Sequence, residues 1–234
     1  MQSLEAELER AKALDVSDLA DAIEDIGFEC TRCGACCTSE ADDPHTATVF
    51  PDEVRELQGA TEYDFRDVAR PMPYGLSDGD DGLEGETFEW ALQTDDCGDC
   101  RFYEEDDDGL GACSVHPDRP LICQTYPFSV ELDGTSQPMG EAVDESGIVR
   151  AHECEGLGSD IDREHAEELA DALKERAVRE LEEAIGVRDN YELANPDSGE
   201  IVVHDSEGAK HPDGSEYDSK RVGGANEVSD DRER

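Results

Sequence analysis

The sequence predicts an α+β protein: a small, irregular cysteine-cluster domain stapled by metal, with short strands, flanking helices and a disordered C-terminal tail. All nine cysteines lie between residues 30 and 154, and helical periodicity appears on both sides of this region. Only 36 % of the 234 residues are hydrophobic, which is low for a globular protein. A stable core therefore requires that metal helps to hold it or that part of the chain stays outside it.

Residues 1–29 are predicted to form a helical lead-in to the cysteine region. Apolar residues recur at helical spacing over residues 3–13. Ser17 is a favourable N-cap for a second helix, and Gly27 is placed to end that helix. We expect these two helices to support the cysteine region by packing.

Four thiols fall in the octet of residues 30–37. A two-residue gap lets two sulfurs from one tight turn reach the same ion, and Gly34 gives the backbone freedom for that turn. Nine thiols exceed the four that one tetrahedral site uses. Adjacent residues such as Cys36 and Cys37 point in different directions, which favours two sites, or one cluster and a redox thiol. The candidate metal ligands are Cys30, Cys33, Cys36, Cys37, Cys97, Cys100, Cys113, Cys123 and Cys154.

Residues 30–158 are predicted to be the metal-binding domain, built from short regular elements. Pro51 favours the first turn of a short helix, and a further helical turn is expected over residues 63–69. Residues 75–86 are rich in glycine and aspartate, so we expect an exposed loop there. Residues 87–92 are expected to form a strand.

The second half of this domain carries a hairpin signal. The Asp-Gly pair at residues 108–109 predicts a hairpin tip between two short strands. Such a hairpin would bring Cys97 and Cys100 near Cys113. Two further elements are expected to follow: a helical turn over residues 118–123 and a strand over residues 128–132.

Residues 159–194 are predicted to form an amphipathic helix that packs on the metal-binding domain. Ser159 and Asp162 have the spacing of a capping box, and apolar residues then recur along one helical face. Gly186 is placed to close this helix. Residues 195–234 lack periodicity and are rich in charge, glycine and serine, which predicts a disordered acidic tail.

The octet by itself does not complete a standard metal motif. Cys30, Cys33 and Cys36 match the first three positions of a bacterial ferredoxin run, but its fourth position falls on Glu40. Two knuckles, Cys30/Cys33 and Cys97/Cys100, have zinc-ribbon spacing, although the distance between them is far longer than in ordinary ribbons. Iron–sulfur and zinc centres therefore both remain open at this point.

The net charge of −44 is spread over the whole chain, which holds 63 acidic residues and only four lysines. A surface of this kind repels itself in dilute solution and depends on screening by dissolved ions. The pattern predicts a protein from a salt-in halophile. It also argues against binding to nucleic acid or to anionic membranes, because their phosphates carry the same sign of charge.

The N-terminus has no basic-then-apolar pattern of a secretory signal, and no apolar run approaches the length of a membrane span. We therefore expect a cytoplasmic protein whose thiols stay reduced. The odd number of cysteines also argues against a disulfide framework.

Five segments carry a resemblance to a known family, and they occur in the family's order: Cys30-x2-Cys33-Gly34-x-Cys36-Cys37, Cys97-x2-Cys100, Cys113, Arg119-Pro120-x2-Cys123-x2-Tyr126-Pro127-Phe128, and Cys154 followed by Gly156 and Gly158. The region around residues 28–158 resembles the CxxCxxCC family, also called the YkgJ-type cysteine-cluster family, a zinc- or iron-chelating domain. The resemblance implies metal chelation by these cysteines. Archaeal members are often labelled iron–sulfur oxidoreductases, and a related domain occurs in flagellin lysine methylases.

Three functions are compatible with these observations. The first is a redox or electron-transfer protein with an iron–sulfur centre, favoured because nine thiols suit multinuclear binding. The second is a zinc-stabilised structural or protein-interaction module without catalysis. The third is a part of a protein-modifying, lysine methylase-like system. The residues single out neither a catalytic group nor a particular protein partner.

Three cationic or titratable side chains near the cysteines have alternative roles. His116 and His152 are candidate ligands, with ordinary surface exposure as the alternative. Arg119 is expected to bond backbone carbonyls in the turn at Pro120, and the alternative role is a charge partner for anionic sulfur.

Overall fold

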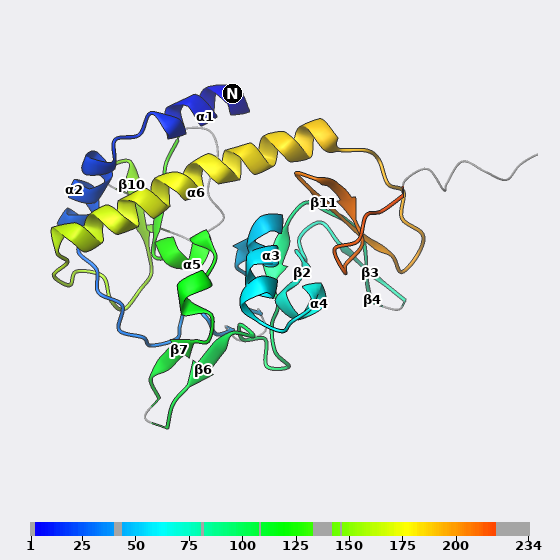
Figure 1. The fold of residues 1–234 in the computed structure, drawn as a ribbon, viewed down its shortest axis with the longest axis horizontal. Helices are drawn as coiled ribbons and strands as arrows, with labels where there is room; N and C mark the ends of the chain where they lie inside the picture. Colours follow the sequence, from blue (N-terminus) through cyan, green and yellow to red (C-terminus); the bar gives the residue numbers. More distant parts are fainter. Residues whose placement is uncertain are drawn as a thin grey trace, which may run out of the picture.

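A computed structural model describes residues 3–39, 44–80, 82–107, 109–132, 142–145 and 147–218 (Figure 1). Helices and several small sheets alternate along the chain, which confirms the predicted α+β class. None of the helices in these ranges combines the length and the apolar composition that crossing a membrane requires. The predicted residues 40–43 of the metal-binding domain and residues 219–234 of the tail lie outside the described residues.

The helices of the described part are α1 (Leu4–Lys12), α2 (Val16–Ile26), α3 (Pro51–Ala60), α4 (Phe65–Val68), the 3-10 turn η1 (His116–Asp118), α5 (Leu121–Thr125) and α6 (Arg163–Asn190). The two N-terminal helices lie where helical periodicity predicted them, and Gly27 ends α2 with a φ of 76°. The predicted cap of α2 was wrong by two residues. Asp15 is the N-cap, because its carboxylate accepts the amide of Ser17 at 2.8 Å.

The strands form four small sheets. Their bounds are β1 (Thr48–Val49), β2 (Ala69–Pro71), β3 (Ser77–Gly79), β4 (Gly82–Thr87), β5 (Trp90–Leu92), β6 (Tyr103–Glu105), β7 (Gly111–Cys113), β8 (Phe128–Val130), β9 (Ala142–Asp144), β10 (Val149–His152), β11 (Ile201–Asp205) and β12 (Gly208–Lys210). The sheet orders are β1-β5-β2, β8-β10-β9, β12-β11-β4-β3 and the hairpin β6-β7. All pairs are antiparallel except β4 with β11.

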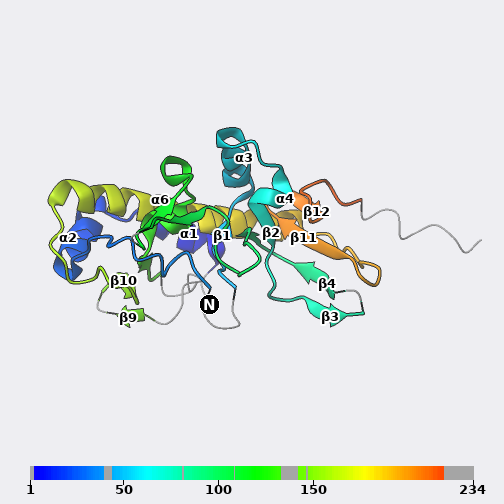
Figure 2. The same cartoon turned by 90° about the horizontal axis from the view of Figure 1, so that it is seen from below.

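The long helix α6 organises the molecule. It runs across the length of the molecule, with α2 beside its first half, α1 beside its second half and β11 near its end (Figures 1 and 2). The helix was predicted to end at Gly186 but continues to Asn190. Gly186 serves close packing instead, because a Cβ built on it would lie 2.6 Å from the Cβ of Ser206. The Asp162 carboxylate caps the helix by accepting the amide of His165 at 2.9 Å.

Two apolar cores lie side by side under α6. The first joins α1, α2, β8 and β10 to the buried face of α6, and Phe28 and Phe128 meet edge-to-face within it. The second joins α3, α4 and the sheet β1-β5-β2 around the buried Trp90. Cysteine-bearing segments border both cores, because Cys154 packs against the first and Cys100 belongs to the second.

The prediction of disorder from residue 195 onward was wrong for the residues that the structure describes. Strand β11 pairs in parallel with β4, and Val202 and Val203 are fully buried. The expected loop over residues 75–86 was also wrong, because it holds β3 and β4. The strand expected over residues 87–92 is split, with β4 ending at Thr87 and β5 beginning at Trp90.

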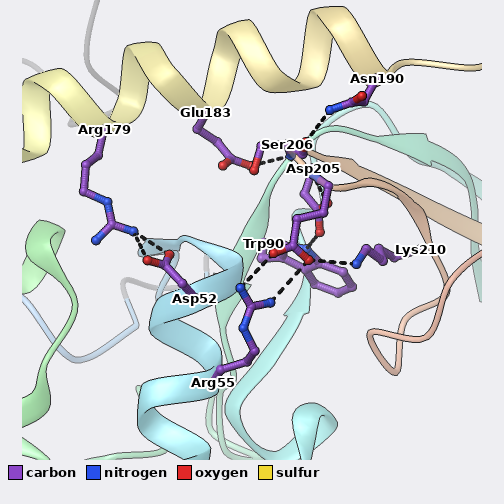
Figure 3. A network of polar contacts seen from close by, with 10 residues as sticks. Asp52, Arg55, Trp90, Arg179, Glu183, Asn190, Asp205, Ser206 and Lys210 are labelled. Carbon is purple, nitrogen blue, oxygen red and sulfur yellow. Dashed lines mark hydrogen bonds and ion pairs between the residues drawn. The ribbon is translucent and has the colours of Figure 1, made fainter.

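A polar network fixes α6 to α3 and to the turn between β11 and β12 (Figure 3). The Glu183 carboxylate accepts the amide of Ser206 at 2.8 Å, and the Asn190 side chain donates to the Ser206 carbonyl at 2.7 Å. Arg179 of α6 pairs with Asp52 of α3. The buried Trp90 indole donates to Asp205 at 3.0 Å. The C-terminal segment is therefore part of the folded body as far as Tyr217, whose amide donates to the Ala209 carbonyl at 2.8 Å.

Candidate metal centre

The octet of residues 30–37 leaves α2 as a loop and turns at Gly34. The φ of Gly34 is 80°, and its carbonyl accepts the amides of Cys37 at 2.8 Å and Thr38 at 3.1 Å. Few residues other than glycine adopt this φ, which confirms the predicted use of Gly34. Arg32 also has a positive φ, of 59°, so the turn holds a residue in an unfavourable conformation.

The octet lies against the β6-β7 hairpin. The Gly111 amide donates to the Arg32 carbonyl, and the Arg32 guanidinium donates back to the Gly111 carbonyl, both at 2.8 Å. The Cys100 amide donates to the Cys37 carbonyl at 2.7 Å. Within the hairpin, Tyr103 pairs with Cys113. These contacts bring Cys37, Cys100 and Cys113 together. The hairpin was predicted to bring Cys100 near Cys113, and it does so.

The other end of the octet is joined to the segment that follows Cys154. Phe28 and Leu157 form an antiparallel bridge, and the Glu29 amide donates to the Gly156 carbonyl at 3.0 Å. The fit is tight, because a Cβ on Gly156 would lie 2.1 Å from the Glu29 carbonyl oxygen. Only glycine therefore suits position 156. The pairing of the two backbone segments brings Cys154 close to Cys30.

Cys123 reaches the cluster on the short helix α5. The buried carboxylate of Glu53 accepts the amides of Leu121 at 2.8 Å and Phe50 at 2.9 Å, which ties the start of α5 to the start of α3. Burial raises the pKa of Glu53, although both amides oppose this shift. The buried Arg176 donates to the Thr125 hydroxyl at 3.0 Å at the other end of α5. The sequence did not single out Glu53 or Arg176, because neither belongs to a local motif.

The nine thiols differ in exposure. Cys30, Cys33, Cys36 and Cys97 are exposed, Cys37, Cys113, Cys123 and Cys154 are half-buried, and Cys100 is buried. Electrostatic contacts connect eight of them. Cys154 interacts with Cys30, Cys33 and Cys36. In a second group, Cys100 and Cys123 interact with each other and with both Cys37 and Cys113, and all four interact with Cys36.

Cys97 is the exception among the described cysteines. Its thiol is not among the largest influences on the pKa of the clustered thiols, although the sequence predicted it as a ligand and the hairpin was expected to bring it near Cys113. The backbone of Cys97 instead belongs to a polar turn. Its amide donates to the Asp95 carboxylate at 2.8 Å, and its carbonyl accepts the Ser39 hydroxyl at 3.1 Å.

The two neighbouring thiols at the centre of the cluster titrate in opposite directions. The sulfurs of Cys36 and Cys37 are 3.8 Å apart. The hydrogen bond from the Cys37 thiol, above all, lowers the pKa of Cys36 to about 7, and the charge of Arg119 adds to this effect. The same hydrogen bond and burial raise the pKa of Cys37. Cys36 is therefore the thiol that is most easily present as a thiolate among those whose pKa is shifted.

Backbone amides donate to three of the sulfurs. Cys100 accepts the amides of Phe102 and Tyr103, Cys113 accepts that of Val115, and Cys154 accepts that of Gly156. In each case an amide two residues after the cysteine points at its sulfur. Such bonds favour the thiolate, which is the form that binds metal. Burial still raises the pKa of Cys100 to about 11.

Two histidines and one arginine near the cluster have defined contacts. His152 is buried and its Nε2 lies 2.8 Å from the Ser129 hydroxyl, so it is a core residue. His116 is exposed, with its Nε2 2.5 Å from the Arg119 guanidinium. The Arg119 side chain was expected to bond backbone carbonyls in the turn at Pro120. Among the described residues, its guanidinium instead contacts His116. Its charge lowers the pKa of both Cys36 and Cys113, though it is not the largest influence on either.

The donor set fits zinc or iron, both of which are bound by groups of thiolates. In the ranges that the structure describes, no three His, Cys, Asp or Glu side chains already stand in the arrangement of a closed ion site. The sulfurs share one neighbourhood and several accept amides, but a bound ion would still have to draw them together. Coupling of this kind between metal binding and local folding is common in small cysteine-rich domains.

Comparison with known proteins identifies a family. The family model CxxCxxCC, with the description "Putative zinc- or iron-chelating domain", matches residues 29–155, which is more than half of the chain. No curated protein and no solved structure matches the chain. The matched range holds all nine cysteines and begins and ends within a few residues of the predicted metal-binding domain.

Proposed function

The chain belongs to the CxxCxxCC family of zinc- or iron-chelating domains, and from this premise we propose that it binds zinc or iron through the thiolates of eight clustered cysteines. One observation carries the proposal. Thiols from five separate segments, between Cys30 and Cys154, are electrostatic neighbours of one another, and their segments border both cores. A reduced protein has little other use for so many adjacent sulfurs, because exposed thiols oxidise readily.

The residues around the cluster prepare it for a cation. Backbone amides donate to Cys100, Cys113 and Cys154, and Arg119 offsets part of the negative charge that several thiolates create. A bound zinc or iron ion supplies the positive charge that keeps buried thiols such as Cys100 deprotonated. Binding therefore releases protons, and metal affinity falls as the pH is lowered.

The test is direct. The full chain is purified without oxygen in high salt, and zinc, iron and acid-labile sulfide are quantified together with the visible absorption. We expect stoichiometric zinc or iron and a melting temperature that falls when the metal is removed. A chain that holds no metal as purified, takes up neither ion after reduction, and melts at the same temperature throughout would overturn the proposal.

Electron transfer through an iron–sulfur centre is the second candidate. The observation that favours it is the exposure of Cys30, Cys33 and Cys36, which places one edge of the cluster at the surface where a redox partner can approach. Iron with equimolar sulfide, and reversible bleaching of the brown colour by dithionite, would support this role. Colourless protein with stoichiometric zinc would instead favour a zinc-stabilised module without redox chemistry.

A further inference from the structure

We propose that the eight clustered thiols form two separate four-thiol metal sites that meet at Cys36 and Cys37, one exposed and one internal. The exposed site is Cys30, Cys33, Cys36 and Cys154; the internal site is Cys37, Cys100, Cys113 and Cys123. Cys97 belongs to neither. This inference rests on the proposed metal binding and assigns each of the eight thiols to one of two sites.

The internal group is defined by the second core. Cys100 is a buried member of that core, and the other three thiols pack against it. The backbone holds them in place: the Cys37 carbonyl accepts the Cys100 amide at 2.7 Å, and Cys113 lies opposite Tyr103 in the hairpin. Cys123 arrives from α5, whose start is fixed by Glu53. Four sulfurs from four segments are the number that closes a tetrahedral site.

The exposed group is defined by the pairing of two loops. The bridge between Phe28 and Leu157 brings the start of the octet to the segment after Cys154. Cys154 packs against the first core, whereas the internal group packs with the second. Cys30 and Cys33 are both exposed. Together with Cys154 they make three thiols, so a four-thiol site needs one more.

Cys36 is that partner, and the turn at Gly34 explains why. Cys36 is exposed like Cys30 and Cys33, whereas its neighbour Cys37 is half-buried against the second core. Of these two adjacent residues, only Cys37 packs against a core, and their sulfurs are 3.8 Å apart. One residue of the pair completes each site, so that both groups reach four thiols without Cys97.

The two sites should hold metal with different lability. A chelator reaches the exposed sulfurs directly, but reaches the internal ones only when the second core opens locally. The internal metal would therefore contribute to folding, and the exposed metal would be open to exchange with solvent or with a partner protein. We expect release from the exposed site to be at least about tenfold faster, which corresponds to a modest opening free energy.

The experiment uses the full chain in high salt, loaded with Zn²⁺ or with Co²⁺ as a coloured probe. We expect two equivalents of Zn²⁺, released by a chelator in a fast and a slow phase. Cys30→Ser should remove one equivalent together with the fast phase. Cys113→Ser should remove the slow phase, and Cys123→Ser provides a second test of the same site if that variant folds poorly. Cys97→Ser is the matched control and should keep both equivalents and both phases.

Other outcomes separate the two proposals. A single equivalent in the unmodified chain, or loss of both equivalents in Cys30→Ser, would show one shared centre and overturn the division while leaving metal binding intact. Loss of an equivalent in Cys97→Ser would place that thiol among the ligands and also overturn the division. No bound Zn²⁺ or Co²⁺ in any sample would overturn the proposed function itself.

Discussion

Gly34 lies directly under the ring of Tyr103, so that a Cβ built on Gly34 would be 2.2 Å from the tyrosine hydroxyl oxygen. The turn of the octet is thus pressed against the hairpin that carries Cys113. This contact adds to the hydrogen bonds of Arg32 with Gly111 and of Cys37 with Cys100, which join the same two parts of the chain. It also makes Gly34 essential for two separate reasons, its positive φ and the space above it.

We predict that Gly34→Ala destabilises the protein and lowers its metal content. Alanine at a φ of 80° costs about 1–2 kcal/mol, and displacement of Tyr103 adds to that cost. Gly109 is the matched control, because its φ is 81° but a Cβ built on it would have nothing within 4 Å. The measurement is the melting temperature and the bound metal of both variants. Equal losses in Gly34→Ala and Gly109→Ala would show that the contact with Tyr103 is unimportant.

Cys36 should be the most reactive thiol of the reduced, metal-free protein. Its pKa is lowered to about 7, chiefly by the hydrogen bond from Cys37, whereas burial raises that of Cys100 to about 11. Because the thiolate is the nucleophile, the alkylation rate of Cys36 should rise with pH and reach half of its maximum near pH 7. Mass spectrometry after brief iodoacetamide treatment identifies the modified residue, and bound metal should protect it.

The source of this reactivity is tested at Cys37. Cys37→Ala removes the donor and should move the midpoint of Cys36 alkylation to higher pH. Cys37→Ser keeps a hydroxyl that can donate, so it should shift the midpoint less. An unchanged midpoint in Cys37→Ala would assign the lowered pKa to another cause, such as the charge of Arg119.

Local patterns predicted the parts of this fold that depend on local interactions. Helical periodicity indicated α1, α2 and α6, and the Asp-Gly pair at residues 108–109 indicated the β6-β7 hairpin. The order of cysteine segments was enough to recognise the family. Each of these signals depends either on residues close together in the sequence or on the spacing of the cysteines. None of them requires knowledge of a distant contact.

Distant contacts account for what was wrong. Strand β11 pairs with β4, more than a hundred residues earlier, and its buried Val202 and Val203 lie in an otherwise polar segment. In the same way, Glu53 caps α5 from 68 residues away and looked like any other acid in a chain with 63 of them. The division of the thiols also depends on which core each loop meets. Spacing alone does not contain that information.

Gly186 gives a prediction that separates helix propensity from packing. Alanine is normally better than glycine inside a helix by about 1 kcal/mol. At Gly186, however, a methyl group would lie 2.6 Å from the Cβ and 3.0 Å from the Cα of Ser206, so backbone would have to move. We expect Gly186→Ala to lower the melting temperature, with a net cost of about 1–3 kcal/mol.

Gly59 in α3 provides the comparison, because a Cβ built on it would have nothing within 4 Å. Gly59→Ala should therefore raise the melting temperature slightly, by up to about 1 kcal/mol in stability. Opposite signs for the two substitutions would confirm the packing of α6 on the β11-β12 turn. A gain in both variants would mean that Ser206 yields easily and that the contact does not hold the C-terminal segment.

The net charge of −44 predicts that the folded state needs salt. Only 19 lysines and arginines are available for 63 acids, and ion pairs such as Arg188 with Glu5 and Arg55 with Glu207 are exposed and contribute little. The repulsion between unpaired carboxylates reaches about 10 Å at 0.1 M salt but only about 3 Å at 1 M. Circular dichroism during stepwise dilution of KCl should therefore show cooperative loss of structure. NaCl should protect equally, because screening depends on ionic strength, and sucrose at matched osmolarity should protect less. Should the helices and the melting temperature survive transfer to dilute buffer, the acidic surface would not be an adaptation to salt.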